Sequence, residues 1–179
     1  MNKITLLIKQ HLEVVKDFPA RGISFQDIFS LTKKPEVLKL IIKEISKIIK
    51  NNAITKIVGI ESRGFLFGMT AAYKEGLPFV PIRKSGKLPG KVSKIKYKLE
   101  YGYDVVEIQS SSIKKSDKIL LVDDLIATGG TAVASVKLLR KFNNREIISF
   151  FVIDLENLNG SDSLEKNGVK VLSLYKTQG

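Results

Sequence analysis

The sequence of 179 residues contains no cysteine and a single histidine, His11. The absence of cysteine excludes disulfide bonds, thiolate nucleophiles and cysteine-ligated metal centres, and it is compatible with a reducing compartment. A single histidine without cysteine also provides no zinc site of the His/Cys type, so we assign His11 no function. Catalysis by a cysteine nucleophile or at a His/Cys zinc centre is therefore excluded.

Long apolar runs are also missing. Stretches such as residues 147–153 are far too short to cross a bilayer, and polar residues interrupt the amino-terminal segment too early for a secretory signal. No internal repeat or low-complexity linker divides the chain, whose length suits one domain with a substantial core. We therefore expect one domain over residues 1–179, located in the cytoplasm and without a membrane partner.

The charge of the chain is strongly unbalanced, with 30 Lys and Arg against 18 Asp and Glu and a formal net charge of +12. A basic surface suits nucleic acids, but it suits phosphorylated metabolites as well. The lysines are spread along amphipathic segments, and no contiguous basic arm or aromatic-interleaved stripe marks a nucleic-acid face. We therefore expect no nucleic-acid partner.

The most informative stretch is KILLVDDLIATGGT, residues 118–131. Its four successive apolar residues are typical of a strand buried on both faces of a parallel sheet. Asp123 and Asp124 follow at the carboxyl end of this strand, where open α/β sheets bind ligands, so we expect both to face a polar ligand. The next residues are small or hydroxylated and precede a helix whose free N–H groups favour an anion: Ala127, Thr128, Gly129, Gly130 and Thr131. The stretch predicts a strand, loop and helix that bind a phosphate.

Strand and helix patterns alternate along the rest of the chain. Apolar residues at helical spacing predict helices over residues 4–15, 35–50, 65–72 and 132–142, and a short helix is expected over 160–168. Strands are predicted at 56–60, 79–83, 104–109, 146–155 and 169–175. Residues 18–31 are interpreted as an ordered loop, and the basic stretch 84–95 as a mobile one. The fold class is α/β, with a central, mostly parallel sheet flanked by helices.

The stretch VDDLIATGGT resembles the phosphoribosyl pyrophosphate signature of the type I phosphoribosyltransferases. The resemblance implies that Asp123 and Asp124 meet the ribose hydroxyls and that residues 127–131 hold the 5′-phosphate. The alternative is a tight strand-to-helix turn capped by the two acids. Gly59 and Gly64 have the glycine spacing of a P-loop, but Phe65 and Leu66 replace the required Lys and Ser or Thr. The sequence therefore argues against a P-loop nucleoside-triphosphate hydrolase.

Four further stretches resemble the adenine phosphoribosyltransferases of this family, in the family's order: FPARGISFQDI, GIESRGFLFG, IRKSGKLPG and LEYG. The first implies an amino-terminal hood, residues 1–34, in which Ile23 offers backbone groups to adenine and Phe25 stacks on it. A plain core role for Phe25 is the alternative. Gln26 stands where the family usually has arginine, which leaves the strictness of adenine specificity open.

The other stretches imply the pyrophosphate site and the catalytic group. Ser62, after a cis peptide bond, and Arg63 would hold the leaving pyrophosphate. Arg83, Lys84 and Lys87 begin a flexible catalytic loop, residues 84–101, with Arg83 reaching across a dimer interface; a solvated basic loop is the alternative. Glu100 matches the glutamate that handles the base proton.

Taken over nearly the whole chain, the resemblance implies a homodimeric enzyme of purine salvage that converts adenine and phosphoribosyl pyrophosphate into AMP and pyrophosphate. Mg²⁺ would bridge diphosphate oxygens and ribose hydroxyls, and no direct side-chain ligand for the metal is predicted. Two alternatives stay open: a transferase for xanthine or another 6-oxopurine, and a non-catalytic regulator that binds phosphoribosyl pyrophosphate.

Overall fold

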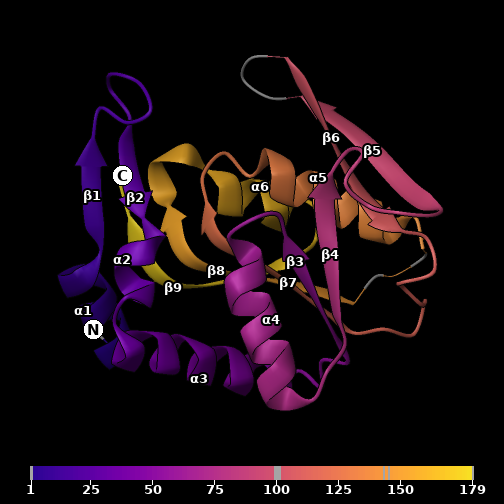
Figure 1. Cartoon of the computed structure of the whole chain (residues 1–179), viewed down its shortest axis with the longest axis horizontal. Coiled ribbons are helices and arrows are strands. Elements are labelled where there is room, and N and C mark those ends of the chain that lie inside the picture. Colours follow the sequence, from indigo (N-terminus) through magenta and orange to yellow (C-terminus); the bar gives the residue numbers. More distant parts are fainter. Residues whose placement is uncertain (1, 99–101, 143, 145, 179) are drawn as a thin grey trace.

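The computed structural model describes residues 2–98, 102–142, 144 and 146–178. Its main feature is a seven-stranded sheet with the order β5-β6-β4-β3-β7-β8-β9 (Figure 1). The strands are β3 (Lys56–Ile60), β4 (Phe79–Lys84), β5 (Val92–Lys98), β6 (Tyr103–Gln109), β7 (Ile119–Ile126), β8 (Ile147–Leu155) and β9 (Lys170–Thr177). Five neighbouring strands are parallel to one another: β4, β3, β7, β8 and β9. Strand β6 pairs antiparallel with β4 and with β5, so the β5–β6 hairpin forms one edge of the sheet. The predicted α/β class is confirmed.

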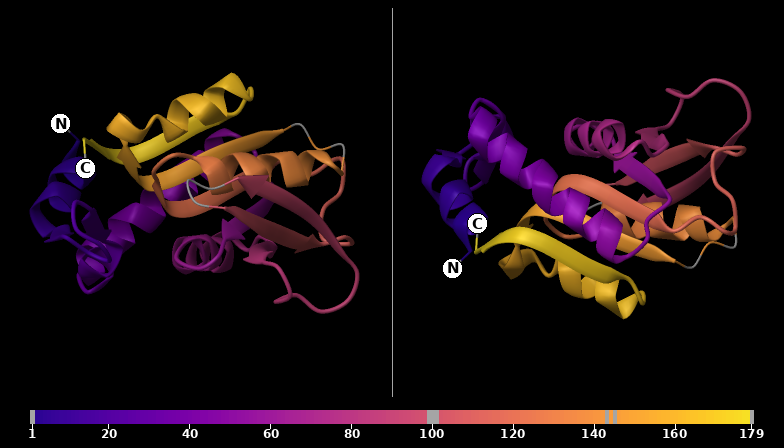
Figure 2. Two further views of the ribbon diagram at one scale, coloured as in Figure 1. Left: turned by 90° about the horizontal axis from the view of Figure 1, so that it is seen from above. Right: turned by 90° about the horizontal axis from the view of Figure 1, so that it is seen from below.

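Helices cover both faces of the sheet. On one face α1 (Lys3–His11), α3 (Pro35–Asn51) and α4 (Gly64–Glu75) share a core with β7 and β8. On the other face α5 (Gly130–Arg140) and α6 (Gly160–Lys166) enclose the second core, and the 3₁₀ turn η1 (Glu156–Leu158) precedes α6. Figure 2 shows α4 and α6 on opposite sides of the sheet. No helix in the parts of the chain described here is long and apolar enough to cross a membrane.

The amino-terminal region differs from the prediction. The helix α1 ends at His11, and β1 (Glu13–Lys16) then pairs antiparallel with β2 (Ser24–Asp27), so the predicted helix was wrong for Val14 and Val15. The predicted loop was also wrong over β2 and the following α2 (Ile28–Thr32), whose first turn is capped by the Asp27 carboxylate. The errors at β1 and β2 share one cause, since the two strands form by pairing with each other across a turn.

The basic stretch after β4 is more regular than predicted. Residues 92–98 form β5, an edge strand along which half-buried Ile95 and Tyr97 alternate with exposed Lys94, Lys96 and Lys98. The lysines lower the mean hydropathy of the segment but lie on one face, so the alternation is that of a strand. The prediction of one loop over residues 84–101 was therefore wrong for β5. Glu100 lies outside the described residues.

Candidate functional site

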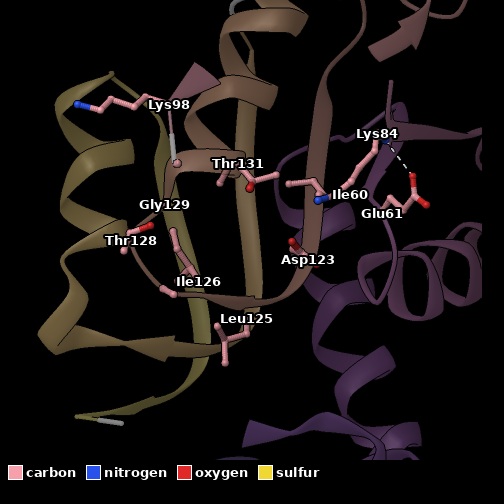
Figure 3. Close-up of a pocket in the computed structure, with 13 residues that line it drawn as sticks. Ile60, Glu61, Lys84, Lys98, Asp123, Leu125, Ile126, Thr128, Gly129 and Thr131 are labelled. Carbon is pink, nitrogen blue, oxygen red and sulfur yellow. Dashed lines mark hydrogen bonds between the residues drawn. The ribbon is translucent and has the colours of Figure 1, made fainter. Parts of the chain in front are cut away.

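Three neighbouring parallel strands end at the same edge of the sheet and form the site. The carboxyl ends of β3, β4 and β7 surround a cavity of about 750 Å³ (Figure 3). The cavity is lined by Ile60, Glu61, Lys84, Lys98, Asp123, Leu125, Ile126 and residues 127–132. This is the edge at which open α/β sheets bind ligands.

The glycine loop, residues 127–131, forms one wall of this cavity. Gly129 has a φ of +79°, and a Cβ atom there would lie 2.8 Å from the carbonyl oxygen of Gly160. The left-handed backbone and the close approach of α6 both require glycine at this position. Helix α5 begins at Gly130 without a side-chain cap, so its first-turn N–H groups are directed at the cavity. The loop therefore has the geometry of an anion site.

The two acids of β7 point in different directions because successive side chains of a strand alternate. Asp123 lines the cavity, whereas Asp124 is only 3% exposed and is absent from the lining. Its Oδ2 atom lies 2.9 Å from Nε of Arg63. The structure thus brings one of the two acids to the cavity and pairs the other with an arginine.

The electrostatic environment of the two acids is unfavourable for their charges. Burial raises the pKa of Asp123 well above its usual range, and the carboxylate of Asp124 raises it further. Burial also raises the pKa of Asp124, although the guanidinium of Arg63 offsets part of that effect. An ionised pair in this position is stabilised only when positive charge is close.

Arg63 connects the acids to the hood. Its guanidinium lies 5.3 Å from the centroid of the Phe25 ring, and that ring packs edge-on against Phe18 at 5.2 Å. The adjacent Gly64 allows α4 to start against β7, since a Cβ atom there would lie 2.5 Å from the Val122 carbonyl oxygen. The peptide bond between Glu61 and Ser62 is cis, as predicted. Arg63 is therefore held between an acid and an aromatic ring rather than in the cavity lining.

Carboxylates hold the cations of the IRKSGK segment. Glu61 accepts hydrogen bonds from the guanidinium of Arg83 and the ammonium of Lys87, and the backbone N–H of Lys84 donates to it at 2.9 Å. Burial by itself would raise the pKa of Glu61, but these donors outweigh it and lower the pKa to about 2. Lys84 lines the cavity, and its Nζ atom lies 2.7 Å from Oδ2 of Asp104.

The residues predicted to bind adenine lie on the hood. The side chain of Ile23 is 46% exposed, its N–H donates to the Ala20 carbonyl and its carbonyl accepts from the Phe18 N–H. Adenine would have to compete with this turn for the backbone groups of Ile23. Phe25 is half-buried between Phe18 and the guanidinium of Arg63.

The sequence did not single out three polar residues at the site: Glu61, Tyr97 and Asp104. Tyr97 lies 3.0 Å from the Thr131 hydroxyl, and Asp104 pairs with Lys84. Glu61 stands inside the GIESRGFLFG stretch, and Tyr97 lies two residues before LEYG. Their partners, however, depend on how β4, β5 and β6 pair, which no local pattern specifies.

This fold and site define an α/β protein with a cavity and an anion-site geometry at the carboxyl ends of parallel strands. The model of the phosphoribosyl transferase domain family matches residues 28–174. An adenine phosphoribosyltransferase of Clostridium botulinum is 45% identical over 168 residues, which cover 94% of this chain and 98% of that protein. The chain therefore belongs to the phosphoribosyl transferase family and, within it, to the adenine phosphoribosyltransferases.

Solved structures agree with this assignment. The adenine phosphoribosyltransferase of Thermoanaerobacter pseudethanolicus superposes with a TM-score of 0.91 at 36% identity, covering 97% of this chain and 99% of that one. The enzyme of Saccharomyces cerevisiae, solved with adenine and an imino-altritol bisphosphate, has a TM-score of 0.90 at 36% identity with the same coverage. The match thus includes the hood and the hairpin as well as the central sheet.

Proposed function

We propose that this chain transfers the phosphoribosyl group of phosphoribosyl pyrophosphate to adenine, giving AMP and pyrophosphate in purine salvage. The observation that carries the proposal is the cavity in which Asp123 faces the glycine loop and the start of α5. An acid for the sugar and an anion site for its phosphate lie there side by side. The S. cerevisiae relative, which was solved with adenine and a bisphosphate, supports this ligand chemistry.

Asp123 and the glycine loop would hold the sugar end of the substrate. The loop donates N–H groups and the Thr128 and Thr131 hydroxyls to the 5′-phosphate, and Asp123 contacts the ribose hydroxyls. As the bond at the anomeric carbon breaks, positive charge develops on the ribose, and an anionic Asp123 stabilises it. Asp124 supports this role by keeping Arg63 close to the pair.

The pyrophosphate would be held by Ser62, Arg63, Arg83, Lys84 and Lys87. Apart from Ser62, these are cations that now contact Asp124, Glu61 or Asp104. A diphosphate carries more charge and more acceptor oxygens than a carboxylate, so it competes for the same donors. Binding would then exchange internal ion pairs for contacts with the substrate, which stabilise the departing charge.

The base would lie between the hood and the cavity, against Phe25 and near the backbone of Ile23. Glu100 is proposed to manage the base proton; as it lies outside the described residues, its role depends on the match of LEYG to the family. The enzyme would work in the cytoplasm, where charged metabolites are retained.

We further propose that Mg²⁺ takes part. The donor set fits a hard cation, since Asp123 presents carboxylate oxygen to the cavity, while the described residues contain no cluster of three or more metal-ligating side chains. The diphosphate oxygens and the ribose hydroxyls that Asp123 contacts would hold the ion, so Asp123 would act on it through the substrate. When bound, Mg²⁺ neutralises charge on the diphosphate.

Incubation of the protein with adenine, phosphoribosyl pyrophosphate and Mg²⁺ tests the proposal, and we expect AMP and pyrophosphate as products. Parallel reactions with guanine, hypoxanthine and xanthine test the 6-oxopurine alternative, which faster turnover of any of these bases would favour. Glu100→Gln should lower kcat by roughly 10²- to 10⁴-fold with little change in KM. Binding of phosphoribosyl pyrophosphate without turnover of any base would instead identify a regulator.

We infer that two copies of the chain associate through α4. Leu66, Met69 and Tyr73 share one face of this helix and are 41%, 51% and 88% exposed. An apolar stripe of this kind is typical of a surface covered by a partner.

Light scattering should give twice the chain mass of 19.9 kDa for the wild type and for a Val14→Lys control on the hood. Met69→Lys with Tyr73→Lys should give the single mass, and a dimer that survives both would place the interface elsewhere.

A further inference from the structure

A chain of polar contacts crosses the rim of the cavity and joins its two ends. Lys84 at the end of β4 pairs with Asp104 on β6 at 2.7 Å. The hydroxyl of Tyr97 on β5 lies 3.4 Å from the same Oδ2 atom of Asp104 and 3.0 Å from Oγ1 of Thr131. Both Lys84 and Thr131 line the cavity, where Figure 3 shows them on either side of Asp123. Tyr97 is the link between the cation and the glycine loop.

The hydroxyl of Tyr97 has one proton and two acceptors. Burial raises the pKa of Tyr97, so the phenol keeps this proton at neutral pH. The ammonium of Lys84 makes the shorter contact with Oδ2 of Asp104, and the Val105 N–H occupies Oδ1 at 2.8 Å. The proton of Tyr97 can reach either acceptor, and the Thr131 contact, at 3.0 Å against 3.4 Å for Asp104, is the shorter one, so we place the proton on the side of Thr131 while Lys84 holds Asp104. Thr131 then accepts, and its own proton is free to point into the cavity.

The opposite arrangement follows if Lys84 leaves Asp104. Oδ2 of Asp104 then loses its nearest donor and becomes the stronger acceptor for Tyr97. Once Tyr97 donates to Asp104, a Thr131 hydroxyl that keeps its contact with Tyr97 is the donor in that contact. It then offers only lone pairs to the cavity, and lone pairs repel a phosphate.

We propose that Tyr97 is a positioning residue that turns the Thr131 hydroxyl toward the 5′-phosphate, and that the Lys84–Asp104 ion pair controls this orientation. The inference rests on the proposed function, since it assigns the 5′-phosphate to the glycine loop and pyrophosphate to Lys84. Its consequence is an antagonism between the two ends of the site: pyrophosphate that draws Lys84 from Asp104 weakens the hold on the 5′-phosphate.

Isothermal titration of ribose 5-phosphate, with and without saturating Mg²⁺-pyrophosphate, tests the antagonism. Pyrophosphate should weaken ribose 5-phosphate binding in the wild type and in Tyr103→Phe, a control on an exposed tyrosine of the same hairpin. Tyr97→Phe should weaken binding of ribose 5-phosphate alone by roughly 3- to 10-fold, the effect of one hydrogen bond. In Tyr97→Phe and Asp104→Asn the further weakening by pyrophosphate should be smaller than in the wild type by about the same factor.

Two more measurements separate positioning from a purely structural effect. Tyr97→Phe should raise the KM for phosphoribosyl pyrophosphate and leave kcat within about twofold. In a Thr131→Ala background the Tyr97→Phe substitution should change ribose 5-phosphate binding no further, because the group that it positions is gone. Should Tyr97→Phe fail to fold, Asp104→Asn alone carries the comparison of binding with and without pyrophosphate.

The outcomes distinguish this inference from the function on which it rests. If the wild type binds ribose 5-phosphate but the substitutions at Tyr97 and Asp104 leave the effect of pyrophosphate unchanged, the positioning role is wrong and the proposed function stands. If the wild type does not bind ribose 5-phosphate, the proposed function fails and this inference fails with it.

Discussion

Gly160 shapes the glycine loop although it lies outside every motif that the sequence revealed. A Cβ atom at Gly160 would overlap the carbonyl oxygen of Ala127 and would lie 2.8 Å from the nitrogen of Gly129. Backbone atoms cannot move aside as a flexible side chain does, so the loop itself would have to shift. The first residue of α6 thereby sets the position of an anion site some thirty residues earlier in the sequence.

We therefore predict that Gly160→Ala impairs binding of phosphoribosyl pyrophosphate. The displaced loop should raise the KM for this substrate by about tenfold and lower the free energy of unfolding by about 1–3 kcal/mol. Gly76→Ala is the matched control, because a Cβ atom there meets nothing although its φ is +65°. It should lose some stability and keep its KM. Equal KM values for the two variants would show that the loop tolerates the shift.

Asp123 illustrates a site residue whose charge opposes folding. Burial and Asp124 raise its pKa, so the folded state binds the proton of Asp123 more tightly than the unfolded state does. The free energy of unfolding therefore falls as pH rises from the unfolded pKa of about 4 through the higher folded value. The charge needed at the ribose is held at a cost in stability.

Asp123→Asn should consequently be more stable than the wild type at pH 7 to 8 and nearly inactive. The gain in melting temperature should shrink as pH falls and vanish below the unfolded pKa of about 4, where the wild-type carboxyl is protonated in both states. Asp162→Asn, on the exposed side of α6, controls for the loss of one negative charge. A lower melting temperature for Asp123→Asn at pH 8 would show that Asp123 stabilises the fold instead.

At the scale of elements, the patterns in the sequence predicted the buried strands and the amphipathic helices to within a few residues. β7 and β8 are continuous apolar runs and α3 carries an apolar stripe, so the local sequence of each segment is enough to predict its burial. The misplaced elements, β1, β2 and β5, are short or lysine-rich strands at the periphery. These three strands form by pairing with another segment of the chain, and a local sequence pattern does not show which segments pair.

The turn between β4 and β5 is held in place by hydrogen bonds to Glu107, a residue that the sequence patterns did not single out. Oε1 of Glu107 on β6 accepts hydrogen bonds from the N–H groups of Lys87 and Leu88, each at 3.0 Å. Oε2 lies 3.3 Å from Nζ of Lys94, and the whole side chain is buried. The predicted mobility of this segment is therefore opposed by the contacts of Glu107.

Hydrogen exchange at the backbone amides that bind Glu107 should test these contacts directly. We predict that the amides of Lys87 and Leu88 are protected in the wild type and lose protection in Glu107→Ala, with a loss of about 2–4 kcal/mol in the free energy of unfolding. Glu107→Gln keeps an oxygen in place and should retain most of the protection. Fast exchange at both amides already in the wild type would favour a turn that is open in solution.

At the scale of the whole molecule, the sequence predicted part of the cavity lining but not the contacts among the charged residues around it. The motifs placed Asp123, the glycine loop and Lys84 around one cavity because strand ends meet at one edge of a parallel sheet. The sequence did not reveal that Arg63 bridges Phe25 of the hood and Asp124 of β7. Which cation meets which acid depends on the assembled fold, since 30 basic residues compete for 18 acidic ones.

The same imbalance governs the behaviour of the molecule in acid. The pKa of Glu61 is lowered from 4.5 to about 2, so its contribution to stability is complete above pH 4.5 and is lost as pH falls toward 2. The contact with Lys84 likewise lowers the pKa of Asp104. As the 18 acidic side chains become protonated, the 30 basic charges repel one another without compensation.

We predict that the melting temperature of the wild type falls steeply between about pH 5 and pH 3, and that Glu61→Gln flattens this fall. The variant should be less stable at pH 7 by roughly 1–3 kcal/mol, because Arg83 and Lys87 lose their charged partner. Near pH 2 its stability should approach that of the wild type, whose Glu61 is then becoming neutral. Glu165→Gln, on an exposed part of α6, should follow the wild-type curve. Parallel curves for the wild type and Glu61→Gln from pH 7 to pH 3 would mean that Glu61 is not the acid that ties the basic loop to the folded molecule.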